Sequence, residues 1–256
     1  RKDMGGHALM MKMAKPRKLS TEEQVRAGAD FIKKYRFEPN AFWEDVLRAE
    51  LQQWQKEAND QVADYVRWKY RRATLIQQSD PKNYFTVRAM HGPGKTYWGA
   101  GTSLWFGTVF PMARIPILAP KFGQITTRFM FEINKIRNLA VPDFQRMTEV
   151  GNANVRWCGY KEWTLFGQTA KKAENLAGLH NDHQLVFCDE ASGIPEALFP
   201  TIFGAVSTGI VQILILIGNP TKNTGTFYDS HCRPKVAKDF CRISIDLEKA
   251  PRVSRK

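Results

Sequence analysis

Residues 89–96 read AMHGPGKT, and this stretch decides the fold of the chain. It fits the phosphate-binding pattern G-x-x-x-x-G-K-[ST], with alanine in place of the first glycine. A tight loop with Gly92 and Gly94 points backbone N–H groups at phosphates, and the following helix N-terminus adds partial positive charge. Lys95 would reach the β- and γ-phosphates, and Thr96 would hold Mg²⁺. The stretch therefore predicts a nucleotide site between a strand and a helix.

Short apolar runs alternate with helical stretches around this loop. We predict strands over 84–89, 113–119, 154–158, 164–168, 184–189, 211–218 and 239–245, and helices over 95–107, 121–138, 194–206 and 224–231. Such alternation predicts an α/β fold with a mostly parallel central sheet flanked by helices. A hairpin over 154–168 is expected within that pattern.

The region before the first predicted strand has a different sequence pattern. Six basic residues and one acid within residues 1–18 indicate a flexible basic arm. Ser20 opens a capping-box pattern, and the helix it begins should end near Phe37, before Pro39. Apolar residues every three or four positions over 43–66 predict one long helix. We expect three parts: the arm over 1–18, a helical N-terminal subdomain over 19–80 and a nucleotide-binding core over 81–256.

Two other apolar strands end in residues suited to hydrolysis. QLVFC runs into Asp189 and Glu190: the first carboxylate can hold the Mg²⁺ shell, and the second can orient and deprotonate the attacking water. Two acids that only cap the next helix are the alternative. ILILI precedes Asn219 and Thr221, which can contact the γ-phosphate or form a plain turn. With the phosphate loop, the acid pair indicates hydrolysis rather than nucleotide binding alone.

The composition favours an acidic partner. The 256 residues include 38 Lys and Arg against 25 Asp and Glu, a net charge of +13. Nucleic acid fits this excess, although ribosome-associated, membrane-surface and other basic proteins share it. No apolar run approaches the ~20 residues of a membrane span, no signal peptide is recognisable, and the four cysteines form no CxxC pair.

These segments together resemble the ATPase domain of the large terminase subunit, the motor that packages DNA into the capsids of tailed bacteriophages. VRAMHGPGKT resembles the Walker A segment of that family, LAGLHNDHQLVFCDEAS its Walker B region, and IGNPTKNTGTFYDSH its coupling motif. LAPKFGQITTRFMFEI resembles the strand and helix that follow Walker A. The resemblance covers residues 45 to 250 and implies a P-loop NTPase of the ASCE type with a helical N-terminal extension.

The resemblance also implies residue roles. Asp189 would be the metal acid, Glu190 the catalytic acid, and Asn219 and Thr221 the coupling residues. Arg88 opens the Walker A segment, which makes it a candidate cis arginine finger or only a strand-end residue. ELQQWQKE resembles the adenine-side segment, so Gln55 would read adenine, supported by Trp54, or be a surface residue of the helix.

The implied activity is ATP hydrolysis with Mg²⁺, coupled to translocation of double-stranded DNA. The implied partners are a portal protein and procapsid, a small terminase subunit and further copies in a ring, a pentamer by resemblance. The implied location is the cytoplasm of the infected bacterial host, without a membrane. Family members carry a C-terminal nuclease domain, and since this chain stops at Lys256 we expect no nuclease activity. The alternatives are another P-loop nucleic-acid translocase or helicase motor, a nucleotide-dependent switch, and a basic structural DNA binder.

Overall fold

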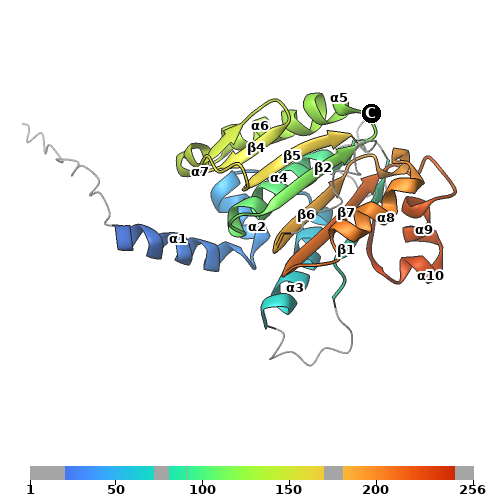
Figure 1. The fold of residues 1–256 in the computed structure, drawn as a ribbon, viewed down its shortest axis with the longest axis horizontal. Coiled ribbons are helices and arrows are strands. Elements are labelled where there is room, and N and C mark those ends of the chain that lie inside the picture. The colour runs from blue at the N-terminus through green and yellow to red at the C-terminus, as the bar shows by residue number, and fades with distance from the viewer. Residues whose placement is uncertain (1–20, 72–80, 91, 170–180, 246–256) are drawn as a thin grey trace, which may run out of the picture.

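A single eight-stranded sheet forms the centre of the molecule (Figure 1). The computed structural model describes residues 21–71, 81–90, 92–169 and 181–245, so the predicted arm over 1–18 lies outside the described residues. The strand order is β3-β4-β5-β2-β6-β7-β1-β8. The strands are β1 Tyr84–Ala89, β2 Arg114–Ala119, β3 Thr148–Val150, β4 Asn154–Trp157, β5 Thr164–Thr169, β6 His183–Cys188, β7 Val211–Gly218 and β8 Phe240–Ile245.

Pairing within the sheet is mostly parallel. All pairs from β5 through β2, β6, β7 and β1 to β8 are parallel, which confirms the predicted α/β class. The predicted hairpin is also confirmed, because β4 runs antiparallel to β5. Each predicted strand is present within one residue of its predicted ends. The short strand β3, antiparallel to β4, was not predicted, because three residues show no usable alternation.

Strand β7 lies between β6 and β1 in this order. It pairs on one side with β1, which runs into the phosphate loop, and on the other with β6, which runs into the acid pair. Arg88 of β1 lies opposite Gly218 of β7 in this register. Because parallel strands end at one edge of a sheet, the three predicted motifs meet there.

Both faces of the sheet are covered, as the apolar pattern of β7 requires. Every residue of β7 is buried. Ile215 belongs to a hydrophobic cluster with Trp98, whereas its neighbour Leu216 belongs to a second cluster with Phe199. Successive strand residues point to opposite faces, so one continuous apolar run supplies two cores. Burial of each such side chain contributes about 1.5–3 kcal/mol.

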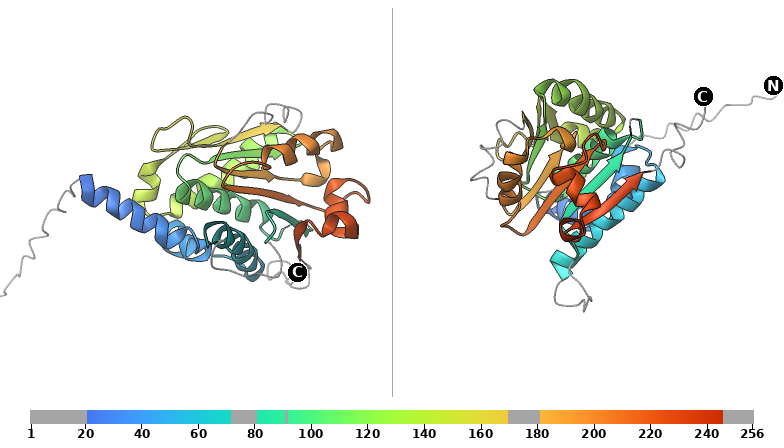
Figure 2. Two further views of the ribbon diagram at one scale, coloured as in Figure 1. Left: turned by 60° about the horizontal axis from the view of Figure 1, so that its bottom comes forward. Right: turned by 90° about the vertical axis from the view of Figure 1, so that its right-hand side faces the viewer.

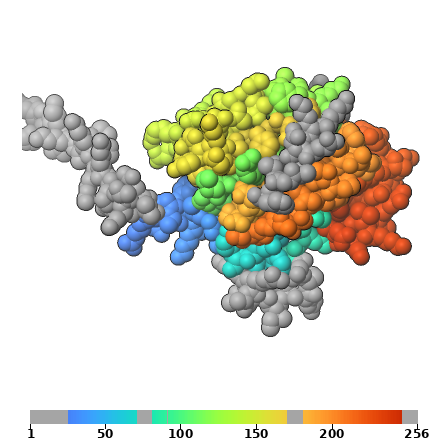
Figure 3. All heavy atoms as spheres, viewed as in Figure 1, coloured from blue at the N-terminus to red at the C-terminus, as the bar shows by residue number. Residues whose placement is uncertain are grey.

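The helices occupy the flanks and ends of the sheet. In Figure 1 the first helix projects at one end of the sheet and the last three cluster at the other; Figure 3 shows the same separation in blue and orange-red. The α-helices are α1 Thr21–Tyr35, α2 Pro39–Phe42, α3 Gln53–Arg71, α4 Lys95–Val109, α5 Phe122–Gln124, α6 Met130–Leu139, α7 Pro142–Met147, α8 Phe199–Ala205, α9 Thr226–Cys232 and α10 Pro234–Ala237. Two π-helical turns, η1 Trp43–Leu47 and η2 Ile125–Phe129, and two 3₁₀ turns, η4 Ala191–Gly193 and η5 Glu196–Leu198, complete the elements of the described ranges.

The single long helix predicted over 43–66 is wrong. The π-helical turn η1 ends at Leu47, the next residue Arg48 has a left-handed φ of 51°, and α3 begins only at Gln53. Trp43 and Val62, on either side of the break, still belong to one hydrophobic cluster. The apolar periodicity therefore arises because these residues share one buried surface, and not because they form one continuous helix. After the break, residues 48–50 line the same cavity as the phosphate-loop residues 92–96.

The N-terminal helices pack directly on the core. The ring of Trp43 lies so close to α4 that a Cβ at Gly101 would be 2.0 Å from it. Figure 2 shows α1 to α3 running along one side of the sheet. The predicted boundary near residue 80 stays a prediction, since these helices and the sheet share one cluster. No helix in the described ranges combines the length and apolarity that a membrane span requires.

Candidate nucleotide site

The phosphate loop joins the end of β1 to the first turn of α4. Gly92 has φ 98° and Gly94 has φ 78°, conformations that L-residues with a Cβ rarely adopt. Both glycines predicted for the loop are therefore required by its backbone. Lys95 is the first residue of α4, so the loop leads directly into a helix N-terminus, whose free N–H groups favour an anion.

Lys95 ties the loop to the neighbouring strand β7. Its Nζ donates to the carbonyl oxygens of Ala89 (3.0 Å) and Met90 (2.6 Å) and to Oδ1 of Asn219 (2.8 Å). The side chain is buried, and this burial lowers the Lys95 pKa, while the charges of Glu190 and Asp189 act in the opposite direction. The structure thus brings Lys95 and Asn219 together as the sheet order predicts.

Asp189 and Thr96 form a pair of hard oxygen donors. Thr96 Oγ1 lies 3.4 Å from Asp189 Oδ2, and the backbone N–H of Glu190 donates to Asp189 Oδ1 (3.1 Å). Burial first, and the charge of Glu190 second, raise the pKa of Asp189 to about 6. A divalent cation would relieve this penalty, and Mg²⁺ prefers such oxygen ligands. The donor set therefore fits the predicted metal.

Glu190 follows Asp189 and lines the same cavity as Lys95 and Thr96. Its φ of 52° is left-handed, which is uncommon for a residue other than glycine. One carboxylate oxygen lies 3.9 Å from Nη1 of Arg128 on η2. A cavity of about 600 Å³ is lined by Arg48, Ala49, Glu50, Gly92, Pro93, Gly94, Lys95, Thr96, Tyr97, Arg128, Glu132, Lys135, Leu139 and Glu190. We call it the nucleotide cavity.

Arg128 is a residue that the sequence reasoning missed. It lies in the segment LAPKFGQITTRFMFEI, to which no role beyond its resemblance was given. Its placement depends on the π-helical turn, and such turns occur frequently at functional sites. No local sequence pattern announces a π-turn, so only the tertiary structure brings Arg128 to Glu190.

Gln55 and Trp54 support the phosphate loop from the N-terminal region. Gln55 is buried; its amide nitrogen donates to the Gly94 carbonyl (3.1 Å), and its Oε1 accepts from the N–H of Gln52 (2.8 Å). Trp54 Nε1 lies 3.2 Å from the Pro93 carbonyl oxygen. The alternative of a surface position for Gln55 is wrong. Its assignment as adenine reader stays a prediction.

The other coupling residue, Thr221, faces the segment after the acid pair. Its hydroxyl donates to Oγ of Ser192 (3.1 Å), in η4. Gly218, at the end of β7, approaches the same segment, since a Cβ there would lie 3.2 Å from the Ala191 nitrogen. The end of β7 thus touches Lys95 on one side and the residues following Glu190 on the other.

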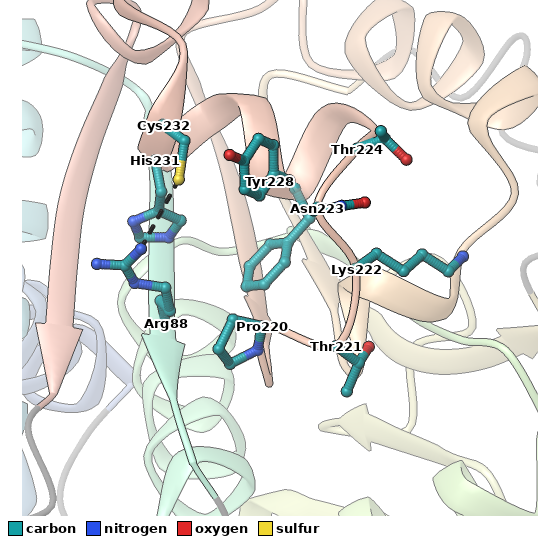
Figure 4. Close-up of a pocket in the computed structure, with 10 residues that line it drawn as sticks. Arg88, Pro220, Thr221, Lys222, Asn223, Thr224, Tyr228, His231 and Cys232 are labelled. Atoms are coloured by element: carbon teal, nitrogen blue, oxygen red, sulfur yellow. Dashed lines mark hydrogen bonds between the residues drawn. The ribbon is translucent and has the colours of Figure 1, made fainter.

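Arg88 is not brought to the nucleotide cavity. Its Nη1 contacts Sγ of Cys232 on α9 (3.8 Å), and Figure 4 shows its guanidinium beside His231 and Cys232. It lines a different cavity, which contains Pro220 and Thr221 but none of the phosphate-loop glycines. The assignment of Arg88 as cis arginine finger stays a prediction, with this placement against it.

The comparisons with known proteins bear on the family and the fold of the chain. No protein-family model matches the sequence. A curated relative, the probable large terminase subunit of Enterobacteria phage P7, is 31% identical over 187 residues, which cover 68% of this chain and 37% of the relative. The chain thus spans little more than a third of that relative's length.

Two solved structures show the same fold. One is an alanine variant of the large terminase ATPase domain from Thermus phage P74-26, with 16% identity, a TM-score of 0.50, and coverage of 80% of this chain and 84% of that chain. The other is the large terminase of a thermophilic bacteriophage in complex with ADP, with 13% identity, a TM-score of 0.54, and coverage of 76% and 46%.

Proposed function

Because this chain is a relative of the large terminase subunits of tailed bacteriophages and has the fold of their ATPase domains, we propose that it hydrolyses ATP to translocate double-stranded viral DNA into a procapsid. One observation carries the proposal. Lys95, Asp189 and Glu190, from two separate motifs, gather with Asn219 at one sheet edge. The ADP in a related solved structure supports nucleotide binding here.

The phosphate loop would bind the nucleotide. Lys95 already donates three hydrogen bonds to protein oxygens, and phosphate oxygens would replace some of these acceptors. Thr96 and Asp189 would hold Mg²⁺, which supplies neutralisation of the developing phosphate charge. Gln55 would read adenine, supported by Trp54; the contacts of both side chains with the loop keep that segment next to the site.

Glu190 would orient the attacking water and accept its proton. We assign Arg128 as its positioning residue, because Nη1 of Arg128 lies 3.9 Å from a Glu190 carboxylate oxygen and both side chains line the nucleotide cavity. Charge on the transferred phosphoryl group would be neutralised by an arginine, either in this chain or from a neighbouring copy. Arg88 remains one candidate for that role.

Asn219 and Thr221 would couple hydrolysis to movement. Asn219 contacts Lys95 directly, and Thr221 contacts the segment after Glu190. A change at the γ-phosphate position would therefore reach the end of β7 through both contacts. Beyond β7, the exposed residues 220–224 form the outer surface.

The partners of the whole assembly belong to the same proposal. They are double-stranded DNA, a portal protein and procapsid, a small terminase subunit and further copies in a ring, in the host cytoplasm. Nuclease activity is no part of the proposal. The alternative is another P-loop nucleic-acid translocase or helicase motor.

The experiment is ATP turnover with and without double-stranded DNA and procapsids, compared with Lys95→Ala. We expect DNA to stimulate the parent and Lys95→Ala to lose nucleotide binding. Stimulation by DNA without any procapsid-dependent protection of DNA from nuclease would favour the alternative motor. A parent protein that binds no ATP would remove the proposal.

A further inference from the structure

A second cavity of about 590 Å³ lies next to the segment that follows β7, separate from the nucleotide cavity (Figure 4). Its walls come from β1, the segment after β7 and helix α9. The lining residues are Arg88, Pro220, Thr221, Lys222, Asn223, Thr224, Phe227, Tyr228, His231 and Cys232. Residues 220–224 are exposed, so the cavity opens to solvent. It shares Thr221, a proposed coupling residue, and Arg88 with the roles discussed above, but none of the phosphate-loop residues lines it.

The lining of this second cavity is cationic. Arg88 and Lys222 contribute positive charge, and no carboxylate is among the lining residues. Two carboxylates lie close by in the chain, and both are engaged. Asp229 forms an ion pair with Arg233 (2.8 Å), and Glu196 accepts from the backbone and hydroxyl of Thr226. Asp229 is therefore neutralised by Arg233, whereas Glu196, bound by uncharged donors, keeps its charge outside the lining of the cavity.

The remaining lining groups are hydrogen-bonding and uncharged. Burial, with the nearby charges of Arg88 and Arg242, lowers the pKa of His231 to about 4, so the ring is neutral at pH 7. Its Nε2 lies 2.9 Å from the Thr86 hydroxyl. The polar lining side chains Thr221, Asn223, Thr224 and Tyr228 are types that donate to phosphate oxygens in protein–DNA complexes.

We propose that the second cavity binds the phosphate backbone of double-stranded DNA. Arg88 and Lys222 lie on opposite sides of Pro220 and Tyr228 (Figure 4), so they do not converge on one point. Two separated cations suit successive phosphates of a polyanion better than a single small anion. The net charge of +13 favours the same ligand. This inference rests on the proposed function, which makes double-stranded DNA the polymer.

The two cavities share the ends of two neighbouring strands. Arg88 of β1 lies opposite Gly218 of β7 in the sheet. One residue further along each strand, the Ala89 carbonyl and Asn219 side chain both accept from Lys95. Pro220 and Thr221 then line the second cavity. DNA bound there would therefore act on the same backbone that holds Lys95, and coupling between two such sites is reciprocal.

The test measures the affinity of the full chain for a short duplex over a range of salt concentrations, without nucleotide. Lys222→Glu should weaken binding about tenfold and reduce the salt slope by about 1, irrespective of duplex sequence. Lys161→Glu is the matched control, because Lys161 is an exposed lysine outside both cavities, and the same charge change there should have an effect below about twofold. Arg88→Gln provides a second variant and should also weaken binding, by a smaller factor, because it removes one positive charge and introduces no negative one.

A second measurement separates this proposal from the proposed function. Lys222→Gln should keep the parent rate of ATP turnover without DNA and lose at least half of its stimulation by DNA. Inorganic phosphate at constant ionic strength should not displace the duplex; if it does so at low millimolar concentration, the cavity is a free-phosphate site. Unchanged duplex affinity in both Lys222→Glu and Arg88→Gln overturns the proposal. A loss of affinity that is fully explained by a changed oligomeric state of the variants overturns it as well. Absent ATP turnover in the parent would instead contradict the proposed function.

Discussion

Nζ of Lys95 donates a hydrogen bond to Oδ1 of Asn219 across 2.8 Å, although 124 residues separate them along the chain. The contact exists because β1 and β7 are parallel neighbours that end at the same sheet edge. It joins the phosphate loop to the segment that lines the second cavity. The contact therefore links the phosphate loop directly to the exposed segment beyond β7.

Substitution of Asn219 tests this path. Asn219→Ala removes one of three acceptors of a buried ammonium group, and such a charged hydrogen bond is worth about 1.5–3 kcal/mol. We expect turnover to fall about tenfold or more, while ATP binding changes only a few-fold because both carbonyl contacts remain. Single-turnover kinetics and nucleotide titration measure the two quantities. Asn152→Ala, at an exposed asparagine, is the control, and equal rates in both variants would refute the assigned role.

The ionised side chain of Asp189 should lower the stability of the folded protein, although the proposed metal site requires it. Its pKa is raised to about 6 from an ordinary value of 3.8, so its charged form is destabilising in the folded protein. The penalty is absent below the unfolded pKa, grows as the pH rises through 3.8 to 6, and reaches about 3 kcal/mol above pH 6. We expect Asp189→Asn to raise the free energy of unfolding at pH 7.5 by up to that amount.

The measurement is urea unfolding without divalent cations at pH 7.5 and pH 5. The stabilisation by Asp189→Asn should shrink at pH 5, because the wild-type carboxyl is then largely protonated in the folded state. The same variant should lose Mg²⁺-dependent turnover. A variant that is less stable than the parent at both pH values would contradict the assigned environment of Asp189.

Arg128 should act on the rate rather than on binding. Arg128→Gln removes the cation that faces Glu190, and we expect kcat to fall about tenfold with KM changed less than threefold. Arg128→Lys keeps the charge and should recover most of the loss. Steady-state kinetics measure both parameters, and Arg146→Gln, at an exposed arginine that lines neither cavity, is the control. A loss confined to KM, or no recovery with lysine, would rule out positioning of Glu190.

The sequence allowed the sheet and most of the site to be predicted, for a physical reason. The strands that end in Asp189 and Asn219 are buried on both faces, so each is a short apolar run with a polar residue at its tip. A glycine-containing loop before Lys95 is compatible with few local backbone structures. These signals are local, and the parallel sheet then brings them together.

The parts that were not predicted depend on non-local packing. The break at Arg48 leaves the apolar period intact, so the sequence shows no interruption. Arg128 reaches Glu190 only through a π-helical turn, and Arg88 turns toward α9 because its strand position faces that side of the sheet. Each placement is decided by a neighbouring element that is distant in sequence.

The most direct test of the central claim is Glu190→Gln, compared with the parent in ATP binding and in ATP turnover. The substitution keeps the size and hydrogen-bonding capacity of the side chain and removes its ability to accept a proton. If Glu190 activates water, the variant should bind ATP as the parent does and hydrolyse it about 10²–10⁴-fold more slowly. Parental turnover in Glu190→Gln would contradict the account.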